Sequence, residues 1–383
     1  PFDSTKLRFT GRPVLRKEDD RLLRGRGRFT DDFALPRQAF AAFVRSPYPH
    51  AVIGEIDTTA ASRLPGVLGI FTPDQASAAQ LNPIGHKPVP STRFDLPLRA
   101  PGGGSIFIGP HLPLPADRVR HVGEAVVMVV ANSHNEALDA AEIIEVQWEE
   151  IGHVSNAKAA LDISASAVWD ETHNNLTVDG WHGDKARADA ALAASPHVVS
   201  TAIHVGRVTG VPLEPRSALA QYDAELDTYT LFAGSGGAVR QRGELAGVLG
   251  IEPQQLRVVS LDVGGNFGTR NRVYVEFALV LWASRVVERP VKYTASRSES
   301  FLSDYQGRDL HTCVTLGIGP DGTFQALRAD NLSNLGARAV SLSPLSKGAA
   351  LVTGSYTIPA AAVRTRAAFT NTVPTQAYRS SGR

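Results

Sequence analysis

The sequence predicts a mixed α/β (α+β) protein with more than one domain. Residues 118–150 have the pattern of a strand, a helix and a second strand, a unit typical of mixed domains. Strand-like and helix-like segments alternate again after residue 195. The length of 383 residues exceeds the ~100–200 residues of one typical domain. With 43% hydrophobic and 20% charged residues, the chain has the composition of a globular protein that buries a core.

The first part of the chain is expected to be an N-terminal arm, residues 1–19, followed by a first domain, residues 20–150. Short apolar runs at 39–44 and 67–71 are bounded by proline and glycine, which is typical of strands. Residues 73–115 are rich in proline and glycine and show little periodicity. They predict a long loop.

The strand–helix–strand unit carries the clearest local signals. Residues 125–130 are apolar and predict a buried strand. Ser133 is placed to cap a helix that runs to Ala141, with Glu136 at the third position of a capping box. Residues 143–148 predict the second strand.

A polar stretch, residues 151–194, is the expected linker to a second domain, residues 195–383. In that domain the patterns again alternate between strands and helices. The expected elements are a strand at 229–232, a turn and helix at 236–249, a strand at 256–263, a helix at 277–287 and a strand at 291–293.

Composition excludes several classes of function. The formal net charge is +1, and no basic stripe with aromatic residues indicates a nucleic-acid partner. No apolar run approaches the roughly 18 residues of a membrane helix, and nothing contradicts a cytoplasmic location. The one cysteine, Cys313, cannot form an intrachain disulfide and is expected to be a small buried residue. His121, His204 and His311 have no ligand-type spacing, so structural roles are expected for them.

Two glycine-rich turns each follow a strand and precede a helix. We call residues 234–237 (Gly-Ser-Gly-Gly) the first corner and residues 264–268 (Gly-Gly-Asn-Phe-Gly) the second corner. Glycine allows positive φ and close approach of a ligand, and successive amides can form an anion nest. Each corner alone is as well explained by a plain tight turn. Together they could converge on one phosphate-bearing or oxo-bearing ligand.

A third motif lies at residues 377–383, Ala-Tyr-Arg-Ser-Ser-Gly-Arg. The guanidinium of Arg379 is always charged and donates in a fixed fork, so a buried arginine here would suit an oxyanion or a phosphate. A surface arginine is the alternative. A polar stretch that contains Asp304 is expected to hold solvated charge pairs.

Taken in order, these segments resemble the large subunit of molybdenum hydroxylases, the xanthine dehydrogenase/aldehyde oxidase/carbon monoxide dehydrogenase family. Residues 25–32 and 117–124, with the strand–helix–strand unit that follows, resemble the a/b-hammerhead domain. Residues 213–216 and 263–268 are similar to the first molybdopterin-binding domain. Residues 356–359 and 377–379 are similar to its later strands and its cofactor-side arginine. The resemblance covers nearly the whole chain, as the N-terminal half of such a subunit.

The resemblance implies a molybdopterin cofactor with molybdenum, in bacteria usually the cytosine dinucleotide form. It also implies hydroxylation of an electron-poor carbon with water-derived oxygen. Electrons then pass to [2Fe–2S] and FAD centres on partner subunits. The cofactor-binding residues implied are Gly236, Gly237, Gly265, Asn266, Phe267, Gly268 and Arg379. Phe267 and Gly268 match the backbone amides beside the oxo ligand of the metal, and Arg379 the arginine near metal and pterin.

The departures from the family's pattern concern the substrate pocket. Gly236 stands where many members have a glutamine that binds the oxo group, so a contact there must come from backbone or water. Asn271, Lys347 and Ser381 replace residues that read or stack on purines, which argues against xanthine. Ser380 replaces the copper-binding cysteine of the carbon monoxide enzymes. The expected substrate is therefore an N-heteroaromatic or an aldehyde carbon.

The catalytic glutamate of the family lies in a Gly-x-Gly-Glu turn of the C-terminal half, and no such turn is present. We expect a C-terminal partner or half to supply it, and the chain alone to be inactive. Two alternatives remain open. One is a non-catalytic fragment, a binding or assembly module that keeps the family scaffold. The other is an unrelated α/β enzyme that binds a phosphate ligand at the two corners.

Overall fold

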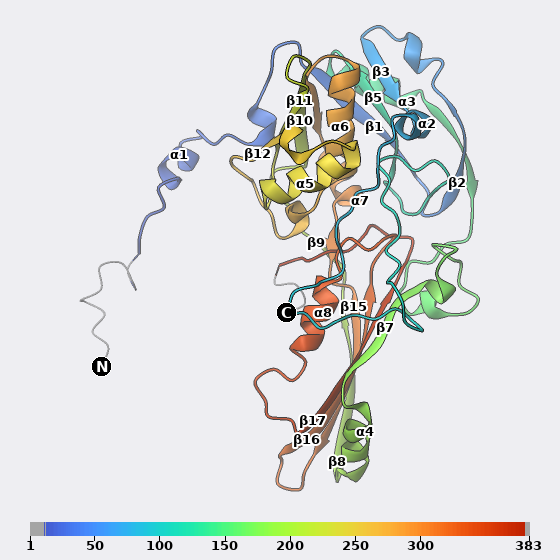
Figure 1. The fold of residues 1–383 in the computed structure, drawn as a ribbon, viewed down its shortest axis with the longest axis vertical. Helices are drawn as coiled ribbons and strands as arrows, with labels where there is room; N and C mark the ends of the chain where they lie inside the picture. Colours follow the sequence, from blue (N-terminus) through green and yellow to red (C-terminus); the bar gives the residue numbers. More distant parts are fainter. Residues whose placement is uncertain (1–10, 12, 380–383) are drawn as a thin grey trace.

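A seven-stranded mixed sheet forms the centre of the upper half of the molecule (Figure 1). The computed structural model describes residues 11 and 13–379. The strands lie in the order β12 (Leu256–Val259), β11 (Thr228–Ala233), β10 (Ser217–Asp223), β13 (Val291–Thr294), β1 (Ala39–Arg45), β5 (Ala125–Ala131) and β3 (Val67–Phe71). The mixed α/β class is thereby confirmed.

This sheet contains strands of both predicted domains. β13 pairs with β1 in parallel, with Ala39 opposite Val291. The two segments are therefore joined by main-chain hydrogen bonds and share one core. Every residue of β5 is buried, which explains its continuous apolar sequence.

Helices cover this sheet. α5 (Ala238–Leu249) and α6 (Val275–Val286) pack beside β10 and β12, and α3 (His134–Glu142) packs on β1 and β5. The predicted cap of α3 is confirmed, because Ser133 Oγ accepts a hydrogen bond from the Glu136 amide. The remaining short helices are α1 (Asp19–Leu23), α2 (Pro73–Ala78) and α7 (Arg297–Ser303).

A three-stranded sheet packs against the outer face of β5 and completes the hammerhead. Its order is β4 (Arg118–Val119), β2 (Ala51–Asp57) and β6 (Glu145–Glu150). The two strands of the predicted strand–helix–strand unit thus belong to different sheets. Val126, Val127 and Val129 of β5 form a buried cluster with Ala51 and Ile53 of β2.

A long five-stranded sheet extends away from the first sheet and forms the lower half of Figure 1. α4 (Lys185–Ala194) packs on it, as does α8 (Ser343–Ala350). Every residue of its edge strand β8 is exposed. The order is β7 (Leu176–Gly183), β17 (Ala360–Ala368), β16 (Phe324–Asn334), β15 (Leu310–Ile318) and β8 (His197–Val205). A two-stranded sheet, β9 (Val208–Thr209) with β14 (Gln306–Gly307), lies between the two halves.

Three expectations differ from this structure. Residues 151–194 are not a structureless linker, because they contain β7 and α4 and bury Val168 and Trp169 in a core. The polar composition reflects short segments with many side-chain hydrogen bonds. Cys313 lies in β15 and is exposed, whereas a buried residue was expected. The strand predicted at 256–263 ends at Val259. Among the described residues, no helix is long and apolar enough to cross a membrane.

Candidate cofactor site

The topology of the first sheet brings the two glycine corners together. β11 and β12 are parallel neighbours, with Tyr229 opposite Leu256. Their carboxyl ends therefore reach the same edge, which is where α/β sheets commonly bind ligands. The Gly236 amide donates to the Arg270 carbonyl at 3.0 Å. A Cβ atom on Gly236 would overlap Asn271 Oδ1, so this close approach requires glycine.

Asn271 occupies the space beside Gly236. Its Oδ1 accepts from Asn266 Nδ2 at 3.0 Å. The two departures from the family's pattern, at positions 236 and 271, are thus in direct contact. The loss of one side chain makes room for the other. The Asn271 side chain is therefore hydrogen-bonded to the second corner. Its role in a substrate pocket stays a prediction.

The segment with Arg379 packs against the second corner. The Arg379 amide donates to the Phe267 carbonyl at 2.8 Å, and the Gln376 side chain donates to the Gly268 carbonyl. The Phe267 and Tyr378 rings stack with centroids 6.4 Å apart. The structure therefore brings together the two glycine corners and the late arginine. Arg379 is exposed, as in the alternative interpretation of the sequence.

Backbone strain is concentrated at this contact. Phe267 has φ 51° and Arg379 has φ 40°, both in the left-handed region that bulky residues rarely adopt. Gly268 has φ 103°, and a Cβ atom there would overlap the Ala377 carbonyl. Such strain persists only where the surroundings enforce it, and it is enriched at ligand sites.

The two corners differ in the donors that they offer. In the first corner the Gly236 amide bonds to Arg270, and the Gly237 amide donates to Ser235 Oγ at 2.9 Å. In the second corner the amides of Gly265, Asn266 and Phe267 donate no hydrogen bond within the described chain. The expected contact from the Gly236 backbone therefore has no support, because that donor is already used. An oxygen-rich ligand fits the second corner, where three successive donors are available.

Glu214 fixes the second corner from behind. Its Oε2 accepts from the Gly264 amide at 2.7 Å, and its Oε1 accepts from the Thr30 amide at 3.1 Å. Arg270 Nη2 donates to the Glu214 carbonyl at 2.9 Å. One carboxylate thus connects the hammerhead segment, the corner and the start of β10. Sequence reasoning gave Glu214 no role of its own, although it lies in the segment 213–216 that carries the resemblance.

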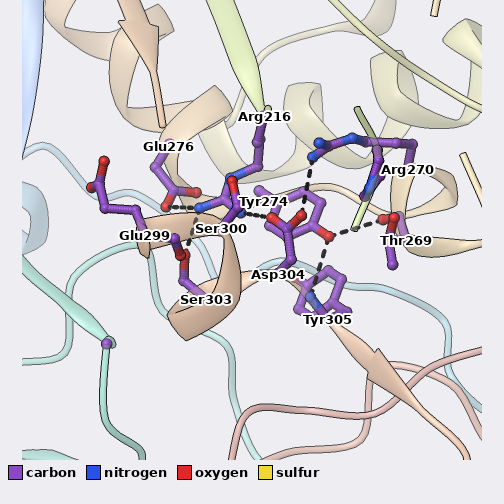
Figure 2. Close-up of polar contacts among 12 residues, drawn as sticks. Arg216, Thr269, Arg270, Tyr274, Glu276, Glu299, Ser300, Ser303, Asp304 and Tyr305 are labelled. Carbon is purple, nitrogen blue, oxygen red and sulfur yellow. Dashed lines mark hydrogen bonds and ion pairs between the residues drawn. The ribbon is translucent and has the colours of Figure 1, made fainter. Parts of the chain in front are cut away.

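A network of charged side chains lies next to Thr269 and Arg270, which directly follow the second corner, as Figure 2 shows. Arg216 is 1% exposed; it binds Glu276 at 2.7 Å and also pairs with Asp304. Arg270 lies 3.7 Å from the second oxygen of Asp304. The expectation of solvated charge pairs around Asp304 is wrong, because Asp304 is 1% exposed. A single sequence does not reveal which polar stretch will be covered.

The electrostatics of this network are strongly coupled. Burial raises the pKa of Glu276, but the guanidinium groups of Arg216 and Arg45 outweigh it and lower that pKa to about 2. Arg45 donates to Glu276 at 2.8 Å and to Glu299 at 3.0 Å. The network therefore ties β1 of the hammerhead to α6, and Glu276 stays ionised at neutral pH.

Two predicted pocket residues are not part of this contact. Lys347 is exposed on α8, with its charge acting on Asp95. Ser381 lies outside the described residues, as does Ser380. A cavity of 330 Å³ opens beside the second corner. Its lining includes Gln376, Tyr378, Pro344, Leu345, Val205 and Leu310.

Comparisons with known proteins agree with this architecture. The family model for the molybdopterin cofactor-binding domain matches residues 168–383. The model for the aldehyde oxidase and xanthine dehydrogenase a/b hammerhead domain matches residues 24–151. Among curated relatives, the nicotine 6-hydroxylase large subunit of Paenarthrobacter nicotinovorans is 31% identical over 97% of this chain and 44% of its own length. The carbon monoxide dehydrogenase large chain of Hydrogenophaga pseudoflava is 29% identical over 96% of this chain.

Among solved structures, quinoline 2-oxidoreductase from Pseudomonas putida 86 matches with a TM-score of 0.85 and 30% identity. The match covers 97% of this chain and 46% of that one. The copper- and molybdenum-containing carbon monoxide dehydrogenase matches with a TM-score of 0.86 and 27% identity. The chain spans less than half the length of these relatives. With both family models matched in order across the fold, the chain belongs to the molybdopterin-binding large subunits of the molybdenum hydroxylases.

Proposed function

We propose that this chain is the N-terminal half of a molybdopterin-binding subunit that hydroxylates the carbon of an N-heteroaromatic ring with water-derived oxygen. The observation that carries the proposal is the hydrogen bond from the Arg379 amide to the Phe267 carbonyl. It brings the backbone of Arg379 next to three amides that are unpaired within the described residues, at one sheet edge. The molybdenum pterin supplies the oxygen-transfer and electron-accepting chemistry when it is bound.

The residues of this chain hold and orient the group. The amides of Gly265, Asn266 and Phe267 are available to donate hydrogen bonds to its oxygen atoms. The guanidinium of Arg379 would offset negative charge on the group, since arginine matches oxyanions in a fixed fork. Glu214 keeps the corner rigid from behind. In the first corner, Gly236 and Gly237 shape the wall of the site. Their amides do not donate to the group, because they already donate to Arg270 and Ser235.

The substrate class is inferred from the cavity beside the second corner and from the relatives. The cavity volume of 330 Å³ and its lining by Tyr378 and Leu345 suit a small ring. Asn271 is held by Asn266, and Lys347 is not among the residues that line the cavity, so neither is placed to read a purine. Relatives with N-heteroaromatic names, nicotine 6-hydroxylase and quinoline 2-oxidoreductase, are about 30% identical to this chain. An aldehyde carbon is the alternative substrate.

The partners follow from the open side of the site. Gly236, Gly237, Phe267 and Arg379 are exposed, and so is all of β8. A C-terminal half or subunit would cover this face. The catalytic glutamate that it carries would act as the general base. A [2Fe–2S] subunit and an FAD subunit would accept the electrons, and the pterin would be the cytosine dinucleotide form. A cytoplasmic location stays a prediction.

Native copurification followed by metal and cofactor analysis tests the proposal. We expect molybdenum and a pterin, with absorption bands of flavin and iron–sulfur centres. Turnover of quinoline or nicotine in isotope-labelled water should place the label in the product, and benzaldehyde tests the aldehyde alternative. A complex that holds its C-terminal partner but no molybdenum would contradict the proposal. It would favour the non-catalytic module.

A further inference from the structure

A cluster of two histidines and one aspartate lies on the five-stranded sheet, apart from the candidate cofactor site. His204 of β8 is directly opposite His311 of β15 in the register of the two strands. Asp309 directly precedes β15, and its φ of 62° lies in the left-handed region. The rings of His204 and His311 are stacked with centroids 4.1 Å apart. One ligand atom from each of the three residues lies within 4.8 Å of the other two.

The aspartate is held in a way that leaves one oxygen available. Asp309 Oδ2 accepts from Arg207 Nε and from Asn334 Nδ2, each at 3.0 Å. Asp309 Oδ1 faces His204 Nε2 at 3.6 Å. Metal sites use this arrangement to orient a carboxylate, with outer hydrogen bonds that fix one oxygen while the other faces an imidazole. Asn334 is fully buried, which makes this anchor rigid.

From this geometry we propose that His204, Asp309 and His311 form a binding site for a divalent transition-metal ion, with Zn²⁺ as its best-suited occupant. Imidazole nitrogen and carboxylate oxygen are the donors that zinc accepts in tetrahedral sites. Three protein ligands leave the fourth position for water. None of its ligands belongs to either glycine corner, although the neighbouring residues Val205 and Leu310 line the cavity proposed for the substrate.

The site has a structural consequence for β8. This edge strand is exposed along its whole length, and within residues 13–379 it pairs only with β15. A metal bound by His204 and by two residues at the start of β15 would fasten the end of the edge strand. Two cations weaken the attraction of these ligands for a metal ion, because Arg207 pairs with Asp309 and the charge of Lys158 acts on His311. We therefore expect binding weaker than that of a four-ligand structural zinc site.

Titration calorimetry of the chelator-treated 383-residue chain with Zn²⁺ tests the proposal. We expect one saturable site. His204→Gln, His311→Gln and Asp309→Asn should each weaken it by at least about tenfold. Asp309→Asn keeps an oxygen acceptor for Arg207 and Asn334, so the fold should persist, as circular dichroism can verify. His197→Gln, an exposed histidine on the same strand, is the matched control and should bind as the wild type does.

Cobalt(II) gives a second readout. Its visible absorption should report four-coordinate geometry in the wild type and disappear in His311→Gln. Binding to the folded state should also raise the melting temperature as the metal concentration rises. The proposal is overturned if the wild type shows no saturable binding. It also fails if the three ligand variants titrate like the wild type, or if His197→Gln loses affinity equally.

Discussion

At the edge of the first sheet, the second corner with Arg379 forms the front, and the charge network around Arg216 forms the back. The two regions differ in exposure, backbone strain and pairing of polar groups. At the front, Phe267 and Arg379 are exposed and have positive φ, and three amides of the second corner are unpaired within the described residues. At the back, Arg216, Glu276 and Asp304 are almost fully buried and pair with one another. A strained open surface of this kind keeps its shape only if something rigid supports it. The charge network provides that support, so stability and ligand binding should depend on different residues.

The sharpest test of this separation is Arg216→Met. Removing the cation takes one partner from each of two buried carboxylates, Glu276 and Asp304, which should destabilise the fold by about 3–5 kcal/mol. Urea unfolding measures the loss. Arg24→Met removes the cation of the exposed pair with Asp20 and should leave the unfolding curve nearly unchanged. Equal effects in the two variants would contradict the idea of a supporting network.

Two buried carboxylates, Glu124 and Glu276, should also govern the stability of the fold at acid pH. Arg338, together with His121 and Arg120, outweighs burial at Glu124, and that pKa falls from 4.5 to about 2, as does the pKa of Glu276. A carboxylate with a depressed folded-state pKa contributes stability above its unfolded pKa and loses it as the pH falls. We expect the free energy of unfolding to drop between about pH 4.5 and pH 2. Glu276→Gln should flatten this drop, whereas exposed Glu225→Gln should not. Parallel curves for all three proteins would exclude Glu276 from the acid response.

At the front, Gly268→Ala should have a smaller but distinct effect. The added Cβ would meet the Ala377 carbonyl, and φ 103° is unfavourable for alanine. We expect a loss of about 1–3 kcal/mol, with the Arg379 segment released from the corner. Gly243→Ala in α5 meets no atom within 4 Å, and it should stabilise the protein by ~0.5–1 kcal/mol. Hydrogen exchange at the Arg379 amide would report the release, and full protection there would count against it.

The smallest expected change in stability comes from Arg379→Ala. Because the side chain is exposed, unfolding should shift by no more than about 0.5 kcal/mol. Cofactor retention should nevertheless fall, since a charged hydrogen bond contributes about 1.5–3 kcal/mol. Molybdenum content of the purified complex measures this, with Arg308→Ala as a neighbouring comparison. Unchanged content and turnover in the Arg379 variant would remove this residue from the site.

Local features of the fold could be predicted from the sequence because they depend on neighbouring residues. The Ser133 cap and the helices after the two corners follow from short-range hydrogen bonding and apolar spacing. The convergence of the two corners was also predicted, because each follows a strand and precedes a helix in the same part of the chain. In contrast, residues 151–194 looked like a linker because short polar segments carry no periodicity, although their strand is held by distant β17.

Pairings between distant segments could not be predicted. His204 and His311 are separated by more than one hundred residues, and only the register of β8 with β15 makes them neighbours. Asp304 looked solvated because its covering residues come from several elements. The contact between Gly236 and Asn271 was likewise hidden, since each departure from the family was read alone. In all three cases tertiary packing, which one sequence does not encode locally, decides the environment.

The parallel pairing of β13 with β1 has a consequence for how the polypeptide can be divided. The two family models meet between residues 151 and 168. This boundary suggests dividing the chain there and expressing the N-terminal and C-terminal fragments separately. Each piece would carry an unsatisfied strand edge where the other had been, and such edges recruit foreign strands. Severing the peptide bond there should therefore leave a particle whose fragments stay associated. Production of either fragment alone should yield aggregates.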